Sequence, residues 1–188
     1  NIKIKNFSDW NQDSTLLVSI LNKDILLNLN DGNALGWSSK IKNIIKNYKN
    51  RFMLKLINWG DADMINFYDH HNNFILPMAA FQKSCGENYS YNMKNWYCNF
   101  AIPFSSFHKY VREDTLHMNK FVTPLEKHYD KFNNIYGEML PAFIKWDSIK
   151  ENYFKIETKE NTHEIVKPDE VEDIWSDDLE EEDKKIIS

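Results

Sequence analysis

Two polar residues that follow apolar segments, Asp31 and His108, are the best candidates for chemistry in this sequence. Asp31 ends the segment ILLNLND, and His108 follows FAIPF and two serines. Carboxylate and imidazole groups are common ligands of zinc and of non-haem iron. Sites in α/β proteins tend to form where strands end and loops begin. If the two segments are neighbouring strands, Asp31 and His108 can share a metal ion.

Their spacing alone is equally consistent with a purely structural role for these residues. An aspartate that ends a strand is commonly a turn or cap residue, and a single histidine beside aromatic residues is commonly structural. A third predicted strand end carries Asp61 and Asp63 after Gly60, which lets the backbone turn tightly. These carboxylates either add to the same site or form a solvated turn.

The hydrophobic pattern predicts the elements that position these residues. Alternation and β-branched residues predict strands, and apolar residues at helical spacing predict helices. The expected strands are 14–20, 25–30, 51–59 and 100–104, and the expected helices are 38–50, capped by Ser38 or Ser39, and 87–98. Residues 105–135 are expected to form a long loop leading into a helix, and 142–157 a helical start with a strand-like end. The order β-β-α-β predicts an α/β sheet covered by helices.

The composition predicts one soluble, cytoplasmic domain. The chain has 188 residues, of which 42% are hydrophobic and 14% aromatic, and this argues against disorder. It contains neither a signal-peptide-like run nor the roughly 20 apolar residues of a membrane helix. Cys85 and Cys98 have no metal-site spacing and are expected to be buried reduced thiols. His117 and His128 are expected at the surface.

Acidic side chains are concentrated at the C-terminal end of the chain. Residues 169–188 carry ten Asp/Glu and two Lys, a net charge of −8, whereas residues 1–168 carry 18 acidic and 21 basic side chains, a net of +3. A basic nucleic-acid-binding surface is therefore not indicated. We expect residues 168–188 to form a separate acidic tail, either a docking helix or a solvated segment.

Two segments resemble one known family. DSTLLVSILNKDILLNLNDG (13–32) and AIPFSSFHKYVREDT (101–115) are similar to the metallo-β-lactamase superfamily, and more narrowly to its CMP-sialic acid hydroxylase-like branch. The resemblance extends over roughly residues 13–125. It implies part of an αββα sandwich, two metal ions of zinc or iron, Asp31 as a bridging ligand and His108 as a further ligand.

The chain departs from that family at its main metal motif, because HxHxDH is absent. His70 and His71 do not have this spacing, and they follow Asp31 along the chain. One explanation is that residues 1–167 are the C-terminal half of the fold, whose partner is a missing N-terminal half carrying HxHxDH. The start at Asn1 instead of Met favours this explanation. The other is a degenerate relative that does not hold two metals.

The resemblance implies catalysis by Asp31 and His108 acting through metal. With zinc, metal-activated water attacks an ester, amide or phosphoester of a small-molecule substrate. With iron, the implied activity is that of a di-iron oxygenase. A non-catalytic pseudoenzyme subunit that uses the tail to bind a partner is the third reading. Ser106 and Arg112 are the candidate substrate-binding residues, although Arg112 can equally pair with Glu113 or Asp114.

Overall fold

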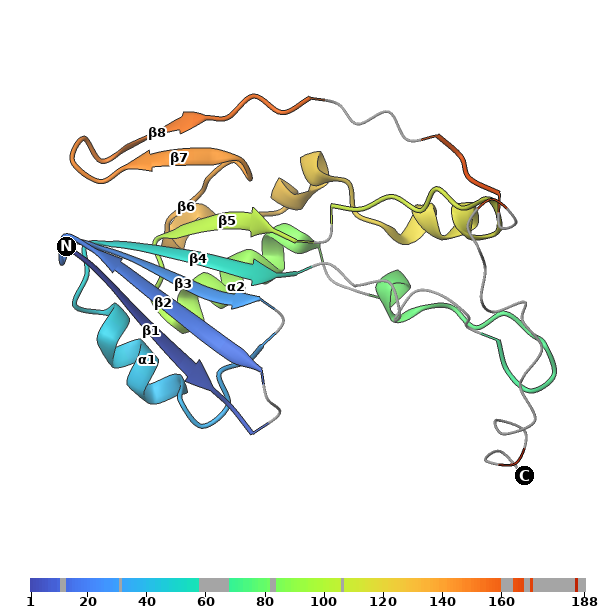
Figure 1. Ribbon diagram of the computed structural model, residues 1–188, viewed down its shortest axis with the longest axis horizontal. Coiled ribbons are helices and arrows are strands. Elements are labelled where there is room, and N and C mark those ends of the chain that lie inside the picture. Colours follow the sequence, from blue (N-terminus) through green and yellow to red (C-terminus); the bar gives the residue numbers. More distant parts are fainter. Residues whose placement is uncertain are drawn as a thin grey trace.

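The protein is an α/β structure built on one six-stranded mixed sheet. The computed structural model describes residues 1–10, 13–30, 32–57, 68–81, 84–105, 107–159, 164–167, 170 and 185. The strands follow one another across the sheet in chain order, from β1 to β6 (Figure 1). The α/β class is thereby confirmed.

An antiparallel meander forms one half of the sheet. Its strands are β1 (Ile2–Ser8), β2 (Ser14–Ile20) and β3 (Asp24–Asn30). Leu21 and Asn22, both with φ of 53°, form the tight turn between β2 and β3. Asparagine tolerates this left-handed conformation, whereas leucine does not favour it. The sequence pattern predicted β2 and β3 but not β1.

Parallel strands form the other half. β3 pairs in parallel with β4 (Asn50–Leu56), β4 with β5 (Phe100–Phe104), and β5 with the short β6 (Glu138–Met139). Helix α1 (Ser38–Ile45) connects β3 to β4, and α2 (Cys85–Trp96) lies between β4 and β5. Parallel strands need such crossovers, and the helices cover a face of the sheet.

Both helices bury their apolar sides on the same face of the sheet. The core of this face contains residues of both helices and four strands: Leu17, Ile25, Leu27, Ile41, Ile45, Met53, Tyr89, Met93 and Ala101. Cys85 and Cys98 lie in it as free thiols, as expected. Helix α1 ends earlier than predicted, and its N-cap is Trp37 with no side-chain cap, so the predicted serine cap is wrong.

A second, two-stranded sheet lies on the opposite face. It is the hairpin of β7 (Ile144–Asp147) and β8 (Asn152–Lys155), in the segment for which we predicted a helical start. That prediction is wrong, because Trp146 instead packs as part of a strand against Phe52 and Phe100, with ring centroids 4.8 and 5.5 Å apart. Figure 1 shows the hairpin above β5 and away from the helices.

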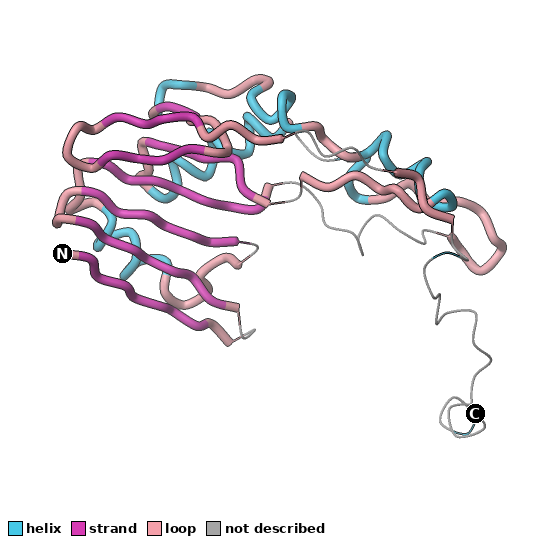
Figure 2. Tube along the Cα trace, turned by 45° about the horizontal axis from the view of Figure 1, so that its top comes forward, coloured by secondary structure: helices cyan, strands magenta, loops and turns pink. Residues whose placement is uncertain are grey.

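The long connections contain 3-10 helices and project beyond the strand ends (Figure 2). These helices are η1 (Met78–Phe81), η2 (Glu113–Phe121), η3 (Leu125–Tyr129) and η4 (Asn134–Tyr136). Segments 68–81 and 107–127 lie together, since Phe74 contacts the ring of His117 and the ammonium of Lys120. In the part of the chain that the structure describes, no helix has the length and apolar character needed to span a bilayer.

Candidate metal-binding site at the strand ends

Three neighbouring strands end at the same edge of the sheet. Because β3, β4 and β5 are parallel and adjacent, their C-terminal residues Asn30, Leu56 and Phe104 lie along one edge, which we call the site edge. The segments that carry Asp31, Asp61 and His108 leave the sheet there, as predicted for neighbouring strand tips. Asp31, Asp61, Asp63 and Ser106 themselves lie outside the described residues.

The end of β3 has an irregular backbone. The pairing with β4 shifts register between Asn28 and Asn30, and Asn30 has a φ of 48°. The Asn30 N–H donates to the side-chain oxygen of Asn28 at 3.0 Å, and the Gly32 N–H donates to the Leu29 carbonyl at 2.8 Å. A bulge and a left-handed residue together redirect the chain at the position that precedes Asp31.

The end of β5 is redirected in a similar way. Ser105, directly after the strand, has a φ of 63°. Serine has no special tolerance for this conformation, so the position is strained. The chain then reaches His108, which is half-buried and whose ring meets the Tyr110 ring edge-on at 5.2 Å. Asn119 exchanges two hydrogen bonds of 2.8 Å with the Tyr110 backbone and so ties this segment to η2.

Arg112 pairs with a neighbouring carboxylate, one of the two roles that the sequence left open. Its guanidinium donates to both carboxylate oxygens of Asp114, at 2.9 and 2.7 Å. This side-chain hydrogen bonding lowers the pKa of Asp114 below its usual range. Substrate binding by Arg112 stays a prediction.

A lysine and a tyrosine that the sequence reasoning missed also lie at the site edge. Lys55 of β4 donates its Nζ hydrogen to the Gly32 carbonyl at 3.3 Å. The hydroxyl of Tyr89 on α2 lies between the Lys55 carbonyl and the Phe104 amide. No sequence motif marks either residue, since each contact joins segments that are distant along the chain.

A buried polar cluster lies under the loop that follows His108. His128 is fully buried, so its predicted surface position is wrong, whereas His117 is exposed as expected. The His128 Nε2 lies 3.2 Å from the Thr123 carbonyl, and its Nδ1 has no hydrogen-bond partner among the described residues. Burial lowers the pKa of His128 and raises that of the Cys85 thiol, so both groups are held neutral.

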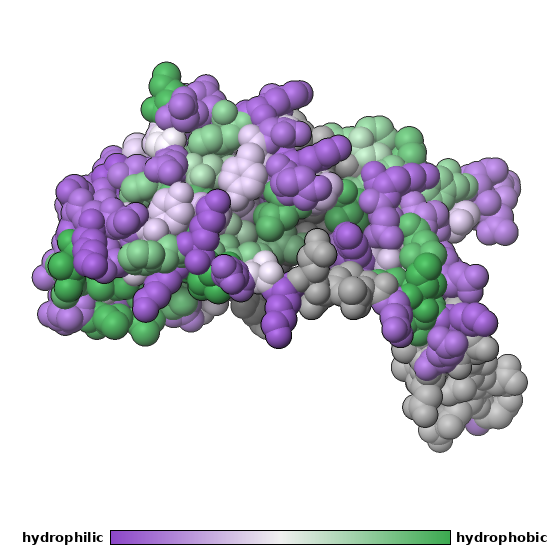
Figure 3. Space-filling model, turned by 90° about the horizontal axis from the view of Figure 1, so that it is seen from above, coloured by the Kyte–Doolittle hydropathy of each residue, from purple (hydrophilic) through white to green (hydrophobic). Residues whose placement is uncertain are grey.

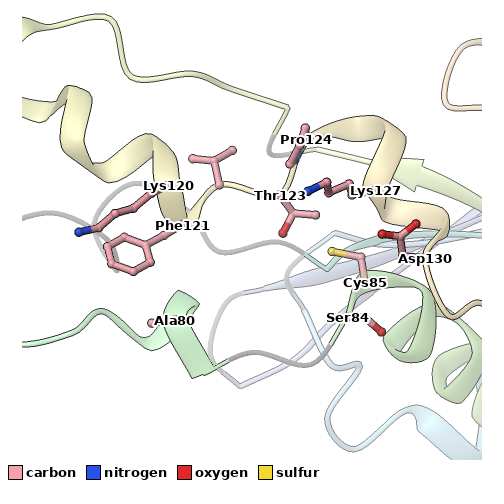
Figure 4. Close-up of a pocket in the computed structure, with 10 residues that line it drawn as sticks. Ala80, Ser84, Cys85, Lys120, Phe121, Thr123, Pro124, Lys127 and Asp130 are labelled. Carbon is pink, nitrogen blue, oxygen red and sulfur yellow. The ribbon is translucent and has the colours of Figure 1, made fainter.

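A cavity of about 400 Å³ adjoins this cluster (Figure 4). Its walls include Ser84, Cys85, Thr123, Pro124, Lys127 and Asp130. In Figure 4 the Cys85 sulfur points toward Thr123, and Lys127 and Asp130 lie on the η3 side. The lining mixes both signs of charge, and the described candidates His108 and Arg112 do not contribute to it.

The described residues supply only part of a metal site. Among them, no group of three or more His, Cys, Asp or Glu side chains lies close enough to hold an ion. His70 and His71 are exposed, and their ring centroids lie 3.8 Å apart. They lie in a turn in which the His71 N–H donates to the Asp69 carboxylate. Comparisons with protein-family models, curated proteins and solved structures gave no match to this chain.

Proposed function

We propose that this chain is the C-terminal half of a metal-dependent hydrolase of metallo-β-lactamase type, with Asp31 and His108 as metal ligands. The observation that carries the proposal is the meeting of the β3 and β5 ends at one edge, where the last residue of β3, Asn30, and the first residue after β5, Ser105, are both in the left-handed conformation. Strained backbone of this kind is concentrated at functional sites. The two loops that follow carry the carboxylate and the imidazole.

The incomplete ligand set fits a half-fold. An imidazole and a carboxylate suit zinc or non-haem iron, but two side chains do not complete a coordination shell. Water would complete the shell of an ion held by this chain alone, and in the whole protein the missing N-terminal half with its HxHxDH motif would supply further ligands. The metal would supply Lewis-acid activation of water for attack on an ester, amide or phosphoester.

The second face of the sheet supports the same proposal. Opposite the helices, the strands present a row of apolar side chains: Ile4, Leu16, Val18, Leu26, Leu54 and Ile102. Most are half-buried, and Ile4 is 67% exposed. Figure 3, viewed from the side of the β7–β8 hairpin, shows apolar surface between polar groups. Two sheets that pack face to face bury rows of this kind, so a second sheet from the missing half fits here.

In this proposal the remaining residues bind and orient the substrate. Ser106 directly follows Ser105 in the sequence, and its hydroxyl would contact the substrate near the metal. Arg112 would bind an anionic substrate group by exchanging its bidentate partner Asp114 for a substrate carboxylate or phosphate. The exposed ion pair makes this exchange inexpensive in free energy.

The test is metal analysis of the purified full chain and of three variants. We expect zinc or iron in the wild type, a loss of metal in Asp31→Ala and in His108→Ala, and unchanged metal in His117→Ala. His117 is the matched control because it is an exposed histidine on η2. A wild type without metal, or one whose metal content neither ligand substitution reduces, would overturn the proposal.

A further inference from the structure

Strand β1 is the outermost strand of the six-stranded sheet (Figure 1). In the part of the chain that the structure describes, its one neighbour in the sheet is β2. All seven residues of β1 pair with β2 in an unbroken antiparallel register, without a bulge or a proline. A regular outermost strand of this kind presents a row of backbone donors and acceptors that can pair with another strand. We call this row the open edge of β1.

Hydrogen bonds at both ends of the β1–β2 pair show which residues direct their backbone groups outward. The Leu21 N–H donates to the Asn1 carbonyl, and the Asp9 N–H donates to the Asp13 carbonyl, each at 2.9 Å. Bonded and non-bonded positions alternate along an antiparallel pair, so the odd-numbered residues of β1 bond to β2. The even-numbered residues therefore direct their N–H and C=O groups to the open edge: Ile2, Ile4, Asn6 and Ser8.

One end of the open edge is closed by a tryptophan. The Trp37 indole donates to the Ser8 carbonyl at 2.8 Å, which agrees with the outward direction of this group. Among the described residues, the outward N–H and C=O groups of Ile2, Ile4 and Asn6 have no hydrogen-bond partner. The backbone of a further strand could therefore bond to β1 over this stretch.

The side chains of β1 differ in chemistry between the two faces of the sheet. Ile2 and Ile4 are 66% and 67% exposed, and Ile4 pairs with Val18 on the face opposite the helices. Lys3 and Lys5 are exposed on the other face, because successive side chains of a strand alternate between faces. A strand added at the open edge would therefore meet apolar side chains on one face and ammonium groups on the other.

The helix-covered face is positively charged along this edge. Phe7 lies on the same face as the two lysines of β1, and the Lys40 ammonium of α1 lies 5.9 Å from the centre of its ring. Strand β1 and helix α1 contain two lysines each and no acidic residue. Acidic side chains of a partner strand would be attracted to this face, whereas basic ones would be repelled.

A second copy of the chain is a poor partner for the open edge. If two β1 strands pair antiparallel about Ile4, Lys3 of one copy lies opposite Lys5 of the other. Shifting the register by two residues in either direction places Lys3 or Lys5 opposite itself. Like charges directly opposite each other destabilise a strand pair, so the lysines disfavour pairing between copies.

We propose that the open edge of β1 binds an extended segment of a partner protein in which apolar and acidic residues alternate. Its backbone bonds to the outward groups of Ile2, Ile4 and Asn6, its apolar side chains lie beside the isoleucines, and its carboxylates lie beside Lys3 and Lys5. In strand addition of this kind, the backbone bonds supply affinity and the alternate side chains supply specificity.

The test measures binding of two fluorescein-labelled peptides to the full chain by fluorescence anisotropy. TVEVEVT has the proposed alternation, and TVQVQVT is its uncharged counterpart. We expect TVEVEVT to bind about fivefold more tightly, since two cross-strand pairs of opposite charge contribute roughly 0.5 kcal/mol each.

Charge reversal locates the preference on β1. The double variant Lys3→Glu and Lys5→Glu should bind TVQVQVT more tightly than TVEVEVT. The control is the double variant Lys145→Glu and Lys155→Glu on the β7–β8 hairpin, which changes the net charge equally at two exposed positions. It should keep the wild-type preference.

Amide hydrogen exchange distinguishes strand addition from a purely electrostatic contact. Bound TVEVEVT should slow exchange of the outward Ile4 and Asn6 amides about tenfold, and the Lys5 amide, which already bonds to β2, should change less. Ile4→Pro removes one outward N–H and no bond to β2, so it should weaken peptide binding. If this variant does not fold, the charge-reversal pair and the exchange measurement decide the question.

The outcomes do not depend on metal, so they are independent of the proposed function. Equal affinity for the two peptides, or a preference that reversal on β1 does not invert, overturns the proposal. Binding of TVEVEVT without slower exchange at Ile4 and Asn6 assigns the peptide to a charged surface and also overturns it. A dimer in light scattering whose Ile4 and Asn6 amides are protected without peptide assigns the open edge to a second copy and overturns the proposed partner.

Discussion

The two ends of the parallel strands are built in opposite ways. At the site edge the links between the strand ends are long hydrogen bonds of 3.3 to 3.5 Å. At the other end, which we call the clasp edge, the buried carboxylate of Asp24 accepts from Asn50 at 2.7 Å and from Trp146 at 3.0 Å. The clasp edge is thus held by shorter and more buried polar contacts than the site edge.

Ion pairs reinforce the clasp edge from outside. Glu151, in the β7–β8 turn, pairs with both Lys23 and Lys49. The Lys23 ammonium also donates to the Ser148 carbonyl at 3.0 Å. The β7–β8 hairpin is therefore held at the clasp edge of the sheet.

The largest expected effect comes from a substitution that disrupts the clasp edge. Trp146→Ala removes two aromatic contacts and one donor to the buried Asp24, and it should lower the free energy of unfolding by about 3 kcal/mol. Phe154→Ala, on the exposed side of β8, should cost much less. Denaturant unfolding measures both, and equal losses would contradict the clasp.

A smaller loss of stability is expected when the Asp24 carboxylate, which accepts both hydrogen bonds, is removed. Asp24→Ala leaves the Asn50 amide and the Trp146 indole without their buried acceptor, and this should cost about 2 kcal/mol. Thermal unfolding of this variant measures the effect. A stability equal to that of the wild type would mean that the Asp24 network contributes nothing.

The site edge should respond in the opposite direction. Ser105→Gly relieves a left-handed residue and should stabilise the fold by about 0.5 kcal/mol, the net of less strain and greater unfolded-state entropy. Ser148→Gly, at the clasp edge, has no such strain to relieve and should be destabilising. If both glycine variants shift stability in the same direction, the strain assigned to Ser105 is contradicted.

The smallest effect is a pH dependence at the clasp edge. Hydrogen bonds from Lys23 and then Lys49 lower the pKa of Glu151 from 4.5. A carboxyl whose folded pKa is depressed stabilises the fold above its unfolded pKa and loses this contribution as the pH falls through the folded pKa. The stability difference between wild type and Glu151→Gln should therefore be constant at neutral pH, begin to fall as the pH drops below 4.5, and vanish once the pH is below the folded pKa. A stability difference that persists in acid would contradict a stabilising role of the Glu151 ion pairs.

Local patterns predicted much of the sheet but little of the site. The alternation in residues 25–30 and the turn residues before it define β3 because both signals are short-range. Residues 142–157 have apolar residues at both helical and strand spacing. Only the packing of Trp146 on Phe52 selects the strand. Local sequence offered no way to choose the partner of Arg112.

The buried polar groups were beyond sequence reasoning for the same physical reason. His128 lies under Thr123 and near the rings of Tyr89 and Phe107, which come from separate segments. Its exposure depends on tertiary contacts and not on neighbouring residues. Tyr89 reads as an ordinary core residue of a helix until its hydroxyl is seen between two strand ends.

The most direct test of the account is a double-mutant cycle for Zn²⁺ affinity on the full chain. If Asp31 and His108 hold the same ion, each alanine substitution should weaken binding strongly, and the double variant should bind no more weakly than the weaker single variant. Losses that simply add in the double variant, or single variants that bind Zn²⁺ as the wild type does, would contradict a shared metal site at this edge of the sheet.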